Sequence, residues 1–190
     1  MKQQFRSQKL LERLQHHPEK KATKDLQIVQ KIKRLSLFKK AVSVCLYLPI
    51  HGEVDLTRIF SAATAAKKKL ILPRVKGKSL DLHVVKSVEQ TSPGSFNILE
   101  PQKHLPKIKP EEIDLVLVPG VVFSENGHRV GYGKGFYDRL LKKTQCPKIG
   151  IAYGFQIVKN IPGAPHDVPM DMIITESKTL KVKRKKPAAA

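Results

Sequence analysis

Short apolar runs that alternate with helix-forming stretches constrain the fold of this chain more than any other feature. The clearest is IDLVLVPG at 113–120, a run of aliphatic side chains that is typical of a buried strand. Similar runs stand at 41–48 and 70–75, and the segment between them favours a loop followed by a helix. Strand–helix–strand alternation is typical of a parallel sheet covered by helices. We therefore predict a single α/β domain with three layers, α/β/α, around a mostly parallel central sheet.

The other segments fit this architecture. Helices are expected over 2–15, 20–34 and from 136, an edge strand at LDLHVVK, a further strand at KIGIAYGF and the last strand at DMIITE. Pro73 closes the predicted strand at LILPRV, and Asn126-Gly127 predicts a hairpin or a turn. Residues 178–190 are basic and have no apolar periodicity, so we expect a folded domain over 1–177 followed by a disordered tail.

The charge of the chain is unevenly distributed. Lys and Arg number 36 and Asp and Glu 16, which gives a formal net charge of +20. Residues 1–40 hold a net +9 and residues 178–190 a net +6, so most of the excess lies at the two ends. A chain this basic attracts polyanions such as nucleic acid, an acidic membrane surface, or polyphosphate and polycarboxylate ligands. Charge alone does not choose among them.

The sequence lacks the features that mark several classes of protein. No apolar run approaches the ~20 residues of a membrane-spanning helix, and the polar N-terminus has no signal-peptide core. Cys45 and Cys146 form no C-x-x-C motif, histidine and cysteine show no zinc-ligand spacing, and G-x-S-x-G is absent. We therefore expect two free thiols in a cytoplasmic protein that contacts no membrane.

The glycine loop GYGKGFYD, residues 131–138, is the most informative stretch for function. Alternate glycines let backbone N–H groups approach an anion, and the predicted helix that follows adds the positive end of its dipole. Arg129 and Lys134 supply cations, and Asp138 supplies a carboxylate suited to magnesium on phosphates. The spacing matches neither a Walker A loop nor a Rossmann fingerprint. A flexible turn is the alternative, but the interleaved charges favour a phosphate site after a buried strand.

Three other groups are weaker candidates. Lys2, Arg6 and Arg13 fall within about 40° of one another on a helix, a basic stripe that could contact a ligand or simply face solvent. Glu53 follows a predicted strand end, where a loop glutamate could face solvent or a ligand. The segment HDVPMD, residues 166–171, places two carboxylates before a strand. One could face a metal while the other is structural, or the segment could be a plain turn.

These motifs together resemble a known family. VPGVVFSENGHRVGYGKGFYDRLL, residues 118–141, is similar to the signature of 5-formyltetrahydrofolate cyclo-ligases, also called 5,10-methenyltetrahydrofolate synthetases. The N-terminal spacing Lys2-x3-Arg6-x6-Arg13 resembles the basic helix of that family. Further similar segments, in family order over almost the whole chain, are YLPIHGEVDL, LILPRV, FNILEP, GIAYGFQ and HDVPMDMIITE.

The resemblance implies an enzyme that uses MgATP to close 5-formyltetrahydrofolate into 5,10-methenyltetrahydrofolate, with release of ADP and phosphate. The formyl oxygen would attack the γ-phosphate, nitrogen 10 would attack the activated carbon, and phosphate would leave. Such a protein has to align the oxygen and neutralise charge on the phosphoryl group. We therefore expect 5-formyltetrahydrofolate and ATP as partners, Mg2+ as cofactor, a monomer, and no requirement for nucleic acid.

The resemblance also implies roles for individual residues. Lys134 and Arg129 would be catalytic cations, Asp138 and Asp167 would be the magnesium ligands, and Arg13 is a further candidate phosphate contact. The implied ATP contacts are Lys2, Gln3, Gln4, Phe5, Arg6, Arg129, Val130, Gly131, Tyr132, Gly133, Lys134, Gly135, Phe136 and Tyr137. The implied folate contacts are Leu48, Glu53, Phe96, Tyr132, Gly133, Lys134, Gly135 and Phe136.

Two of these residues depart from the family pattern. Phe136 stands where tyrosine is common, so that stacking is kept but a hydroxyl hydrogen bond is lost. Phe96 stands where some members have tryptophan. These departures concern folate contacts and leave the phosphate residues untouched.

Two alternative functions stay open at this point. A nucleic-acid-binding protein would explain the basic ends of the chain but gives no reason for the charged glycine loop. An inactive relative on the same fold is the other alternative, and the presence of the charged motif residues argues against it.

Overall fold

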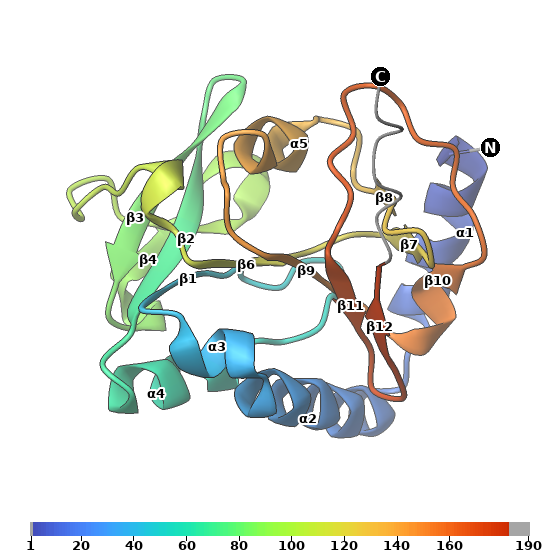
Figure 1. Ribbon diagram of the computed structural model, residues 1–190, viewed down its shortest axis with the longest axis horizontal. Coiled ribbons are helices and arrows are strands. Elements are labelled where there is room, and N and C mark those ends of the chain that lie inside the picture. The colour runs from blue at the N-terminus through green and yellow to red at the C-terminus, as the bar shows by residue number, and fades with distance from the viewer. Residues whose placement is uncertain (1, 183–190) are drawn as a thin grey trace, which may run out of the picture.

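The computed structural model describes residues 2–182 and centres on a seven-stranded sheet with the strand order β12-β11-β9-β6-β1-β2-β3 (Figure 1). The strands are β1 (Ser43–Cys45), β2 (Lys69–Lys76), β3 (Ser79–Val85), β6 (Leu115–Val118), β9 (Lys148–Ile151), β11 (Met172–Ile174) and β12 (Thr179–Lys181). The five inner strands pair in parallel, and only the edge strands β3 and β12 run antiparallel to their neighbours. The predicted, mostly parallel central sheet is confirmed.

Helices cover both faces of this sheet, which confirms the three predicted layers. On one face lie α2 (Pro18–Arg34), α3 (Ser36–Lys40) and α4 (Thr57–Ala65), and on the other lies α5 (Phe136–Leu141) (Figure 1). The N-terminal helix α1 is Lys2–Leu14, and Pro18 then begins α2 because proline lacks the N–H that a first helical residue leaves unpaired. Short 3-10 turns are η1 (Val88–Gln90), η2 (Ser95–Asn97), η3 (Pro110–Glu112) and η4 (Gly154–Gln156).

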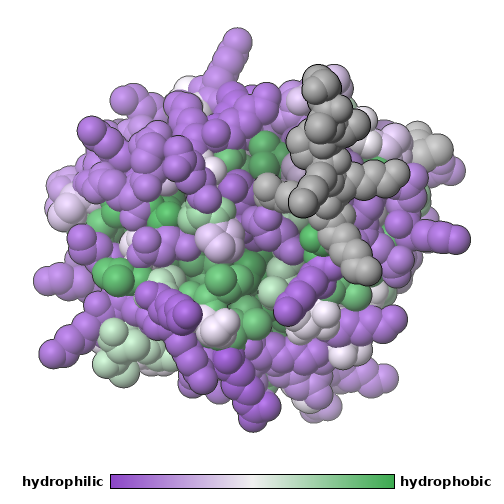
Figure 2. Space-filling view, viewed as in Figure 1, coloured by the Kyte–Doolittle hydropathy of each residue, from purple (hydrophilic) through white to green (hydrophobic). Residues whose placement is uncertain are grey.

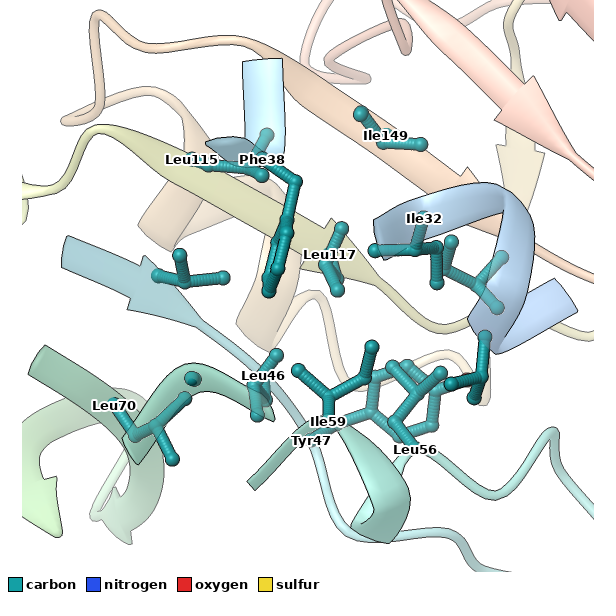
Figure 3. Close-up of a cluster of buried hydrophobic side chains, with 14 of the residues drawn as sticks. Ile32, Phe38, Leu46, Tyr47, Leu56, Ile59, Leu70, Leu115, Leu117 and Ile149 are labelled. Atoms are coloured by element: carbon teal, nitrogen blue, oxygen red, sulfur yellow. The ribbon is translucent and has the colours of Figure 1, made fainter. Parts of the chain in front are cut away.

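The apolar strands are buried on both faces, as a central parallel sheet requires. In β6, Leu115 and Leu117 join the cluster under α2, α3 and α4, together with Ile32 and Phe38 (Figure 3). The alternate residues of β6 join a second cluster on the other face, which includes Leu140 of α5. This division follows from the two-residue repeat of a strand, and it fixes the sheet between its two helical layers.

Two small sheets flank the central one. The hairpin of β7 (Val122–Ser124) and β8 (Arg129–Val130) turns at Asn126-Gly127, as predicted, and β10 (Ile157–Val158) pairs with β7. Helix α1 packs on this small sheet because Phe5 and Leu10 contact its buried valines. The second small sheet consists of β4 (Thr91–Pro93) and β5 (Leu99–Pro101). The hairpin leads directly into the glycine loop and so positions it.

Two predicted strand boundaries are wrong. Strand β2 continues through Pro73, which pairs with Leu82 of β3. The carbonyl of Ile71 accepts from the backbone N–H of Leu46, just past the end of β1. Backbone polar groups two residues apart in a strand point to the same side. Pro73 therefore lacks an N–H only on the side where β1 has already ended, so no hydrogen bond of the sheet is lost. The last strand is β12 rather than 171–176, because Thr179–Lys181 pairs with β11. The disorder predicted from residue 178 is therefore wrong for β12, and residues 183–190 lie outside the described part of the chain.

Candidate functional site

A cavity of about 490 Å³ lies at the carboxyl ends of the central parallel strands. Its walls come from the segments that follow β1 and β6, from β2 and β3, from the glycine loop, and from the N-terminal end of α1. Open α/β sheets bind ligands at this edge. The lining includes most of the predicted site residues, namely Lys2, Arg6, Leu48, Glu53, Phe96, Asp167 and every residue from 129 to 138.

The glycine loop has the backbone conformation that its glycines were expected to allow. Gly133 and Gly135 have φ angles of +94° and +65°, a region in which side chains are strained. Arg6 reaches from α1 to the loop, and its Nε donates to the carbonyl of Gly131 across 2.8 Å. A β-carbon on Gly133 would lie 3.4 Å from the Arg6 guanidinium. The loop and the N-terminal helix therefore pack together closely.

The two predicted catalytic cations have different surroundings. Arg129 is almost fully buried, pairs with Asp138 across 2.9 Å, and lies 5.6 Å from the centre of the Tyr137 ring. Lys134 is exposed at the rim, and its ammonium lies 5.8 Å from the centre of the Phe96 ring. No carboxylate among residues 2–182 lies within ion-pair distance of Lys134. Its charge is therefore available to a ligand, whereas that of Arg129 is shared with Asp138.

Lys2 and Asp167 come from opposite ends of the chain and form an ion pair with a distance of 2.7 Å. Burial acts to raise the pKa of the Asp167 carboxyl, but hydrogen bonds from Lys2 and from the backbone N–H of Ala164 outweigh it and hold that pKa below its usual range. Asp167 is therefore ionised at neutral pH and anchors the start of α1 in the cavity wall.

Asp138 and Asp167 suit a magnesium ion that is held mainly by a ligand. Both carboxylates line the cavity and stay partly accessible, with side-chain exposures of 24% and 11%. Within the described residues there is no cluster of three or more His, Cys, Asp or Glu side chains that could enclose a metal. Magnesium on a nucleotide usually takes one or two protein carboxylates and completes its shell with phosphate oxygens and water. The donor set therefore fits nucleotide-bound Mg2+ rather than a metal held by protein alone.

Glu53 lies on the opposite wall in a buried polar network. Its side chain is 4% exposed, and one carboxylate oxygen accepts from the Tyr132 hydroxyl across 3.2 Å. The other accepts from the backbone N–H of Ile50. Burial raises the pKa of the Glu53 carboxyl to about 7, although Arg13 and these hydrogen bonds act in the opposite direction. Loss of water dominates because charged carboxylates are strongly stabilised by hydration.

Arg13 does not lie where a phosphate contact is expected. Its side chain is fully buried, and its guanidinium is taken up by groups of the protein, including the carbonyls of His51 and Gly120. Arg13 does share one face of helix α1 with Lys2 and Arg6, as the helical spacing predicted. However, α1 passes over the molecule so that only its first turns border the cavity. The interpretation of Arg13 as a phosphate contact is wrong for this reason.

Three residues of the predicted ATP segment also lie away from the cavity. Gln3 accepts a hydrogen bond from Arg6, Gln4 is exposed, and Phe5 packs against the valines of the small sheet. Successive helical residues point about 100° apart, so a contiguous stretch of five cannot all face one ligand. Asp171, the other carboxylate of the 166–171 segment, accepts from the backbone N–H of Lys148 and is the structural one of the pair.

An apolar wall completes the cavity, and sequence reasoning did not find it. It comes from four separate segments and includes Ile50, Val75, Leu80, Ile98 and Leu99. Apolar residues of this kind look like core in a sequence. The pairing of β2 with β3 and the contact of β5 with β2 bring them to one place. Phe96 borders this wall, 64% exposed and with a φ angle of +59° that is unusual for a residue with a side chain.

The fold and the cavity define an α/β protein with a cleft lined by cations and carboxylates at the carboxyl ends of its strands, and comparison with known proteins specifies its class. A model of the 5-formyltetrahydrofolate cyclo-ligase family matches residues 1–176. The 5-formyltetrahydrofolate cyclo-ligase of Mycoplasma genitalium is 30% identical over 176 residues, which cover 91% of this chain and 96% of that protein. The Escherichia coli K12 enzyme of the same name is 31% identical, with coverage of 73% and 80%.

Solved structures give the same result. The Aquifex aeolicus 5,10-methenyltetrahydrofolate synthetase superposes with a TM-score of 0.88 at 36% identity, and covers 100% of this chain and 96% of its own. The Mycoplasma pneumoniae 5,10-methenyltetrahydrofolate synthetase gives a TM-score of 0.76 at 29% identity, with coverage of 92% and 98%. This chain belongs to the 5-formyltetrahydrofolate cyclo-ligase family, a family of ligases of folate metabolism. No helix in the described range 2–182 has the length and hydropathy needed to cross a membrane.

Proposed function

We propose that this protein closes 5-formyltetrahydrofolate to 5,10-methenyltetrahydrofolate in a reaction that consumes MgATP and releases ADP and phosphate. One observation carries the proposal. The cations Arg129 and Lys134 lie 76 or more residues from Glu53 in the sequence, and they line one cavity with its buried carboxylate. The family to which the chain belongs supplies the reaction class, and the cavity supplies groups suited to each substrate.

The chemistry needs alignment more than it needs covalent participation by the protein. The formyl oxygen attacks the γ-phosphorus of ATP, the bond from that phosphorus to the bridging oxygen breaks, and ADP leaves. Nitrogen 10 then attacks the activated carbon, and the carbon–oxygen bond breaks with departure of inorganic phosphate. Nitrogen 10 loses its proton to the surroundings. Catalysis of phosphoryl transfer rests largely on in-line positioning and on neutralisation of charge.

The phosphate end of the site lies between the glycine loop and α1. Lys134, which lacks a carboxylate partner among the described residues, stabilises the charge that develops on the transferred phosphoryl group. Arg129 keeps a buried Nε–H with no hydrogen-bond partner in the described structure, and its ion pair holds Asp138 in place. Asp138 and Asp167 would hold magnesium, which neutralises phosphate charge when it is bound. Arg6 and Lys2 secure the loop and the cavity wall.

The folate end lies between Glu53 and the apolar wall. An ionised Glu53 accepts hydrogen bonds from N–H groups of the pterin, which a neutral carboxylic acid does less well. Leu48 and the exposed ring of Phe96 offer apolar surface to the flat ring system. In this proposal the formyl group lies between Glu53 and the glycine loop, within reach of the γ-phosphate.

An isotope experiment tests this course of reaction. The enzyme is given 5-formyltetrahydrofolate labelled with 18O in the formyl group, together with ATP and magnesium, and the released phosphate is analysed by mass spectrometry. Because the formyl oxygen bonds to phosphorus and leaves with it, one 18O atom is expected in each phosphate. Unlabelled phosphate alongside methenyl product would contradict the proposed phosphorylation of the formyl oxygen.

A further inference from the structure

Arg13 is a buried charge whose partners come from three parts of the chain. Its side chain has no measurable exposure. Its Nε donates to the carbonyl of His51 across 2.7 Å, and one Nη donates to the carbonyl of Gly120 across 3.2 Å. The other Nη donates to the hydroxyl of Tyr132. Burial of a guanidinium costs folding free energy unless its N–H groups have hydrogen-bond partners. The fold supplies these partners to Arg13.

The hydrogen bonds continue from Arg13 to the predicted folate contact. Tyr132 accepts from Arg13 and donates to the carboxylate of Glu53 across 3.2 Å. The Arg13 guanidinium itself lies 3.9 Å from the same carboxylate oxygen. Tyr132 belongs to the glycine loop and Glu53 to the loop after β1. The hydrogen-bond network Arg13–Tyr132–Glu53 therefore joins the two ends of the cavity.

We propose that Arg13 is a positioning residue that favours the ionised form of the Glu53 carboxylate for the folate and fixes Tyr132 of the glycine loop. This inference rests on the proposed function, because it assigns Glu53 to the folate. Arg13 itself touches neither substrate, since it does not line the cavity. It acts through the two residues that do, and it links folate binding to the conformation of the phosphate loop.

The surroundings of Glu53 explain why Arg13 has this effect. Within residues 2–182, the phenols that interact electrostatically with Glu53 are those of Tyr132, Tyr47 and Tyr137, and all three stay neutral because burial raises the pKa of each hydroxyl. Arg13 is the cation that acts on Glu53 and lowers the pKa of its carboxyl. Without the guanidinium, burial acts on Glu53 unopposed by a cation, and the acid form gains.

Steady-state kinetics of Arg13→Met, Arg13→Lys and the control Lys9→Met test the proposal. Lys9 is a cation of α1 that pairs with Glu12 and borders no part of the cavity, so its loss controls for helix charge. Arg13→Met is expected to raise the KM for 5-formyltetrahydrofolate roughly 10-fold and to move the acid limb of kcat/KM upward by about one pH unit. Arg13→Lys should move that limb back towards the wild-type position, and Lys9→Met should match wild type.

Two outcomes would overturn the proposal. One is an Arg13→Met enzyme with wild-type folate KM and wild-type acid limb. The other is a loss confined to kcat and to the KM for ATP, which would indicate a phosphate role. If Arg13→Met does not fold, Arg13→Lys and Tyr132→Phe are combined in a double-mutant cycle. Effects on kcat/KM that are less than multiplicative support the linked network, whereas fully independent effects refute it.

A titration without substrates separates this inference from the proposed function. The Glu53 carboxyl is followed by 13C NMR in ligand-free protein labelled at glutamate, in wild type and in Arg13→Lys and Arg13→Met. A higher midpoint in Arg13→Met than in wild type supports the role of Arg13 even if the wild-type protein forms no methenyl product. An unchanged midpoint refutes that role even if the enzyme is active.

Discussion

Asp138 is tied to Arg129 across 2.9 Å, so a substitution at this position tests the phosphate end of the site without disturbing the core. Asp138→Asn keeps the volume and removes the charge. We expect turnover to fall by roughly 100-fold or more, because the proposed magnesium ligand and the partner of Arg129 are lost together.

The measurement is kcat as a function of magnesium, with thermal unfolding as the check on the fold. Asp81→Asn is the matched control, since Asp81 pairs with Lys107 outside the cavity and should keep full activity. Wild-type turnover of Asp138→Asn at low magnesium would refute the metal assignment.

The raised pKa of the Glu53 carboxyl predicts that the stability of the protein falls as pH rises. The pKa of its carboxyl is about 7 in the folded protein and near 4.5 when the chain is unfolded. The folded state therefore holds the proton more tightly, and the free energy of unfolding falls as pH rises from about 4.5 to about 7. Above that window the cost is fully present, on the order of 3 kcal/mol.

Urea unfolding of wild type and Glu53→Gln across pH 4 to 8 checks this. Other titrating groups cancel in the difference between the two proteins, to the extent that their effects are independent. The difference should decline with rising pH inside the window and level off above it. A difference that is flat with pH would show that Glu53 titrates normally.

At the level of elements, the glycine loop depends on backbone conformations that other residues resist. Gly133→Ala should cost about 1 kcal/mol of stability and raise the KM for ATP, because its φ of +94° is strained with a side chain and its new methyl would contact Arg6. Gly77→Ala is the control, since Gly77 has a φ of +57° in open space between β2 and β3. It should lose similar stability and keep the wild-type KM. Equal kinetic effects of both substitutions would count against the loop as a phosphate site.

Much of the element layout could be predicted from the sequence, because the strands carry a local apolar signal. Four consecutive aliphatic residues, Leu115–Val118, predict a buried strand whatever surrounds them. The passage of β2 through Pro73 could not be predicted, because it depends on where the neighbouring β1 ends. Strand β12 was missed because its residues are largely exposed and its order comes from pairing with β11.

The site also has parts that could be predicted from the sequence and parts that could not. The glycine loop is contiguous, so its charges and glycines are visible together in the sequence. The position of Arg13 was missed because helical spacing gives the direction of a side chain but not what lies opposite it. The apolar wall depends on contacts between distant strands. A buried arginine and an exposed one look alike in a sequence, and the structure distinguishes them.

At the scale of the whole molecule, the excess of basic over acidic side chains among residues 2–182 lies outside the cavity. Most of the face in Figure 2 is hydrophilic, with apolar side chains gathered near its centre. The acidic and basic side chains that line the cavity are equal in number, namely Lys2, Arg6, Arg129 and Lys134 against Glu53, Glu100, Asp138 and Asp167. Attraction of anions from a distance therefore comes from the surface rather than from the cavity lining.

This distribution predicts a salt dependence of substrate capture. Raising the ionic strength from about 0.05 to 0.3 M should lower kcat/KM for ATP several-fold while kcat changes less, because screening weakens long-range attraction. A neutral osmolyte at equal osmolality is the control and should have little effect. A salt-independent kcat/KM would show that surface charge does not guide these substrates.

Binding of nucleic acid to the basic surface is the alternative to a metabolic role. RNA affinity that falls steeply with salt and survives Asp138→Asn would favour that alternative, because the substitution removes a proposed phosphate-site residue and leaves the surface charge nearly unchanged. RNA binding that competes with ATP would instead indicate that the polyanion enters the same cavity.

The most direct test of the account is the absorbance of 5,10-methenyltetrahydrofolate formed from 5-formyltetrahydrofolate by the purified protein. The account predicts product only when ATP and magnesium are both present, with one ADP released for each product. Folded protein that gives no product over a range of metals and pH, or product that forms without ATP, would contradict it.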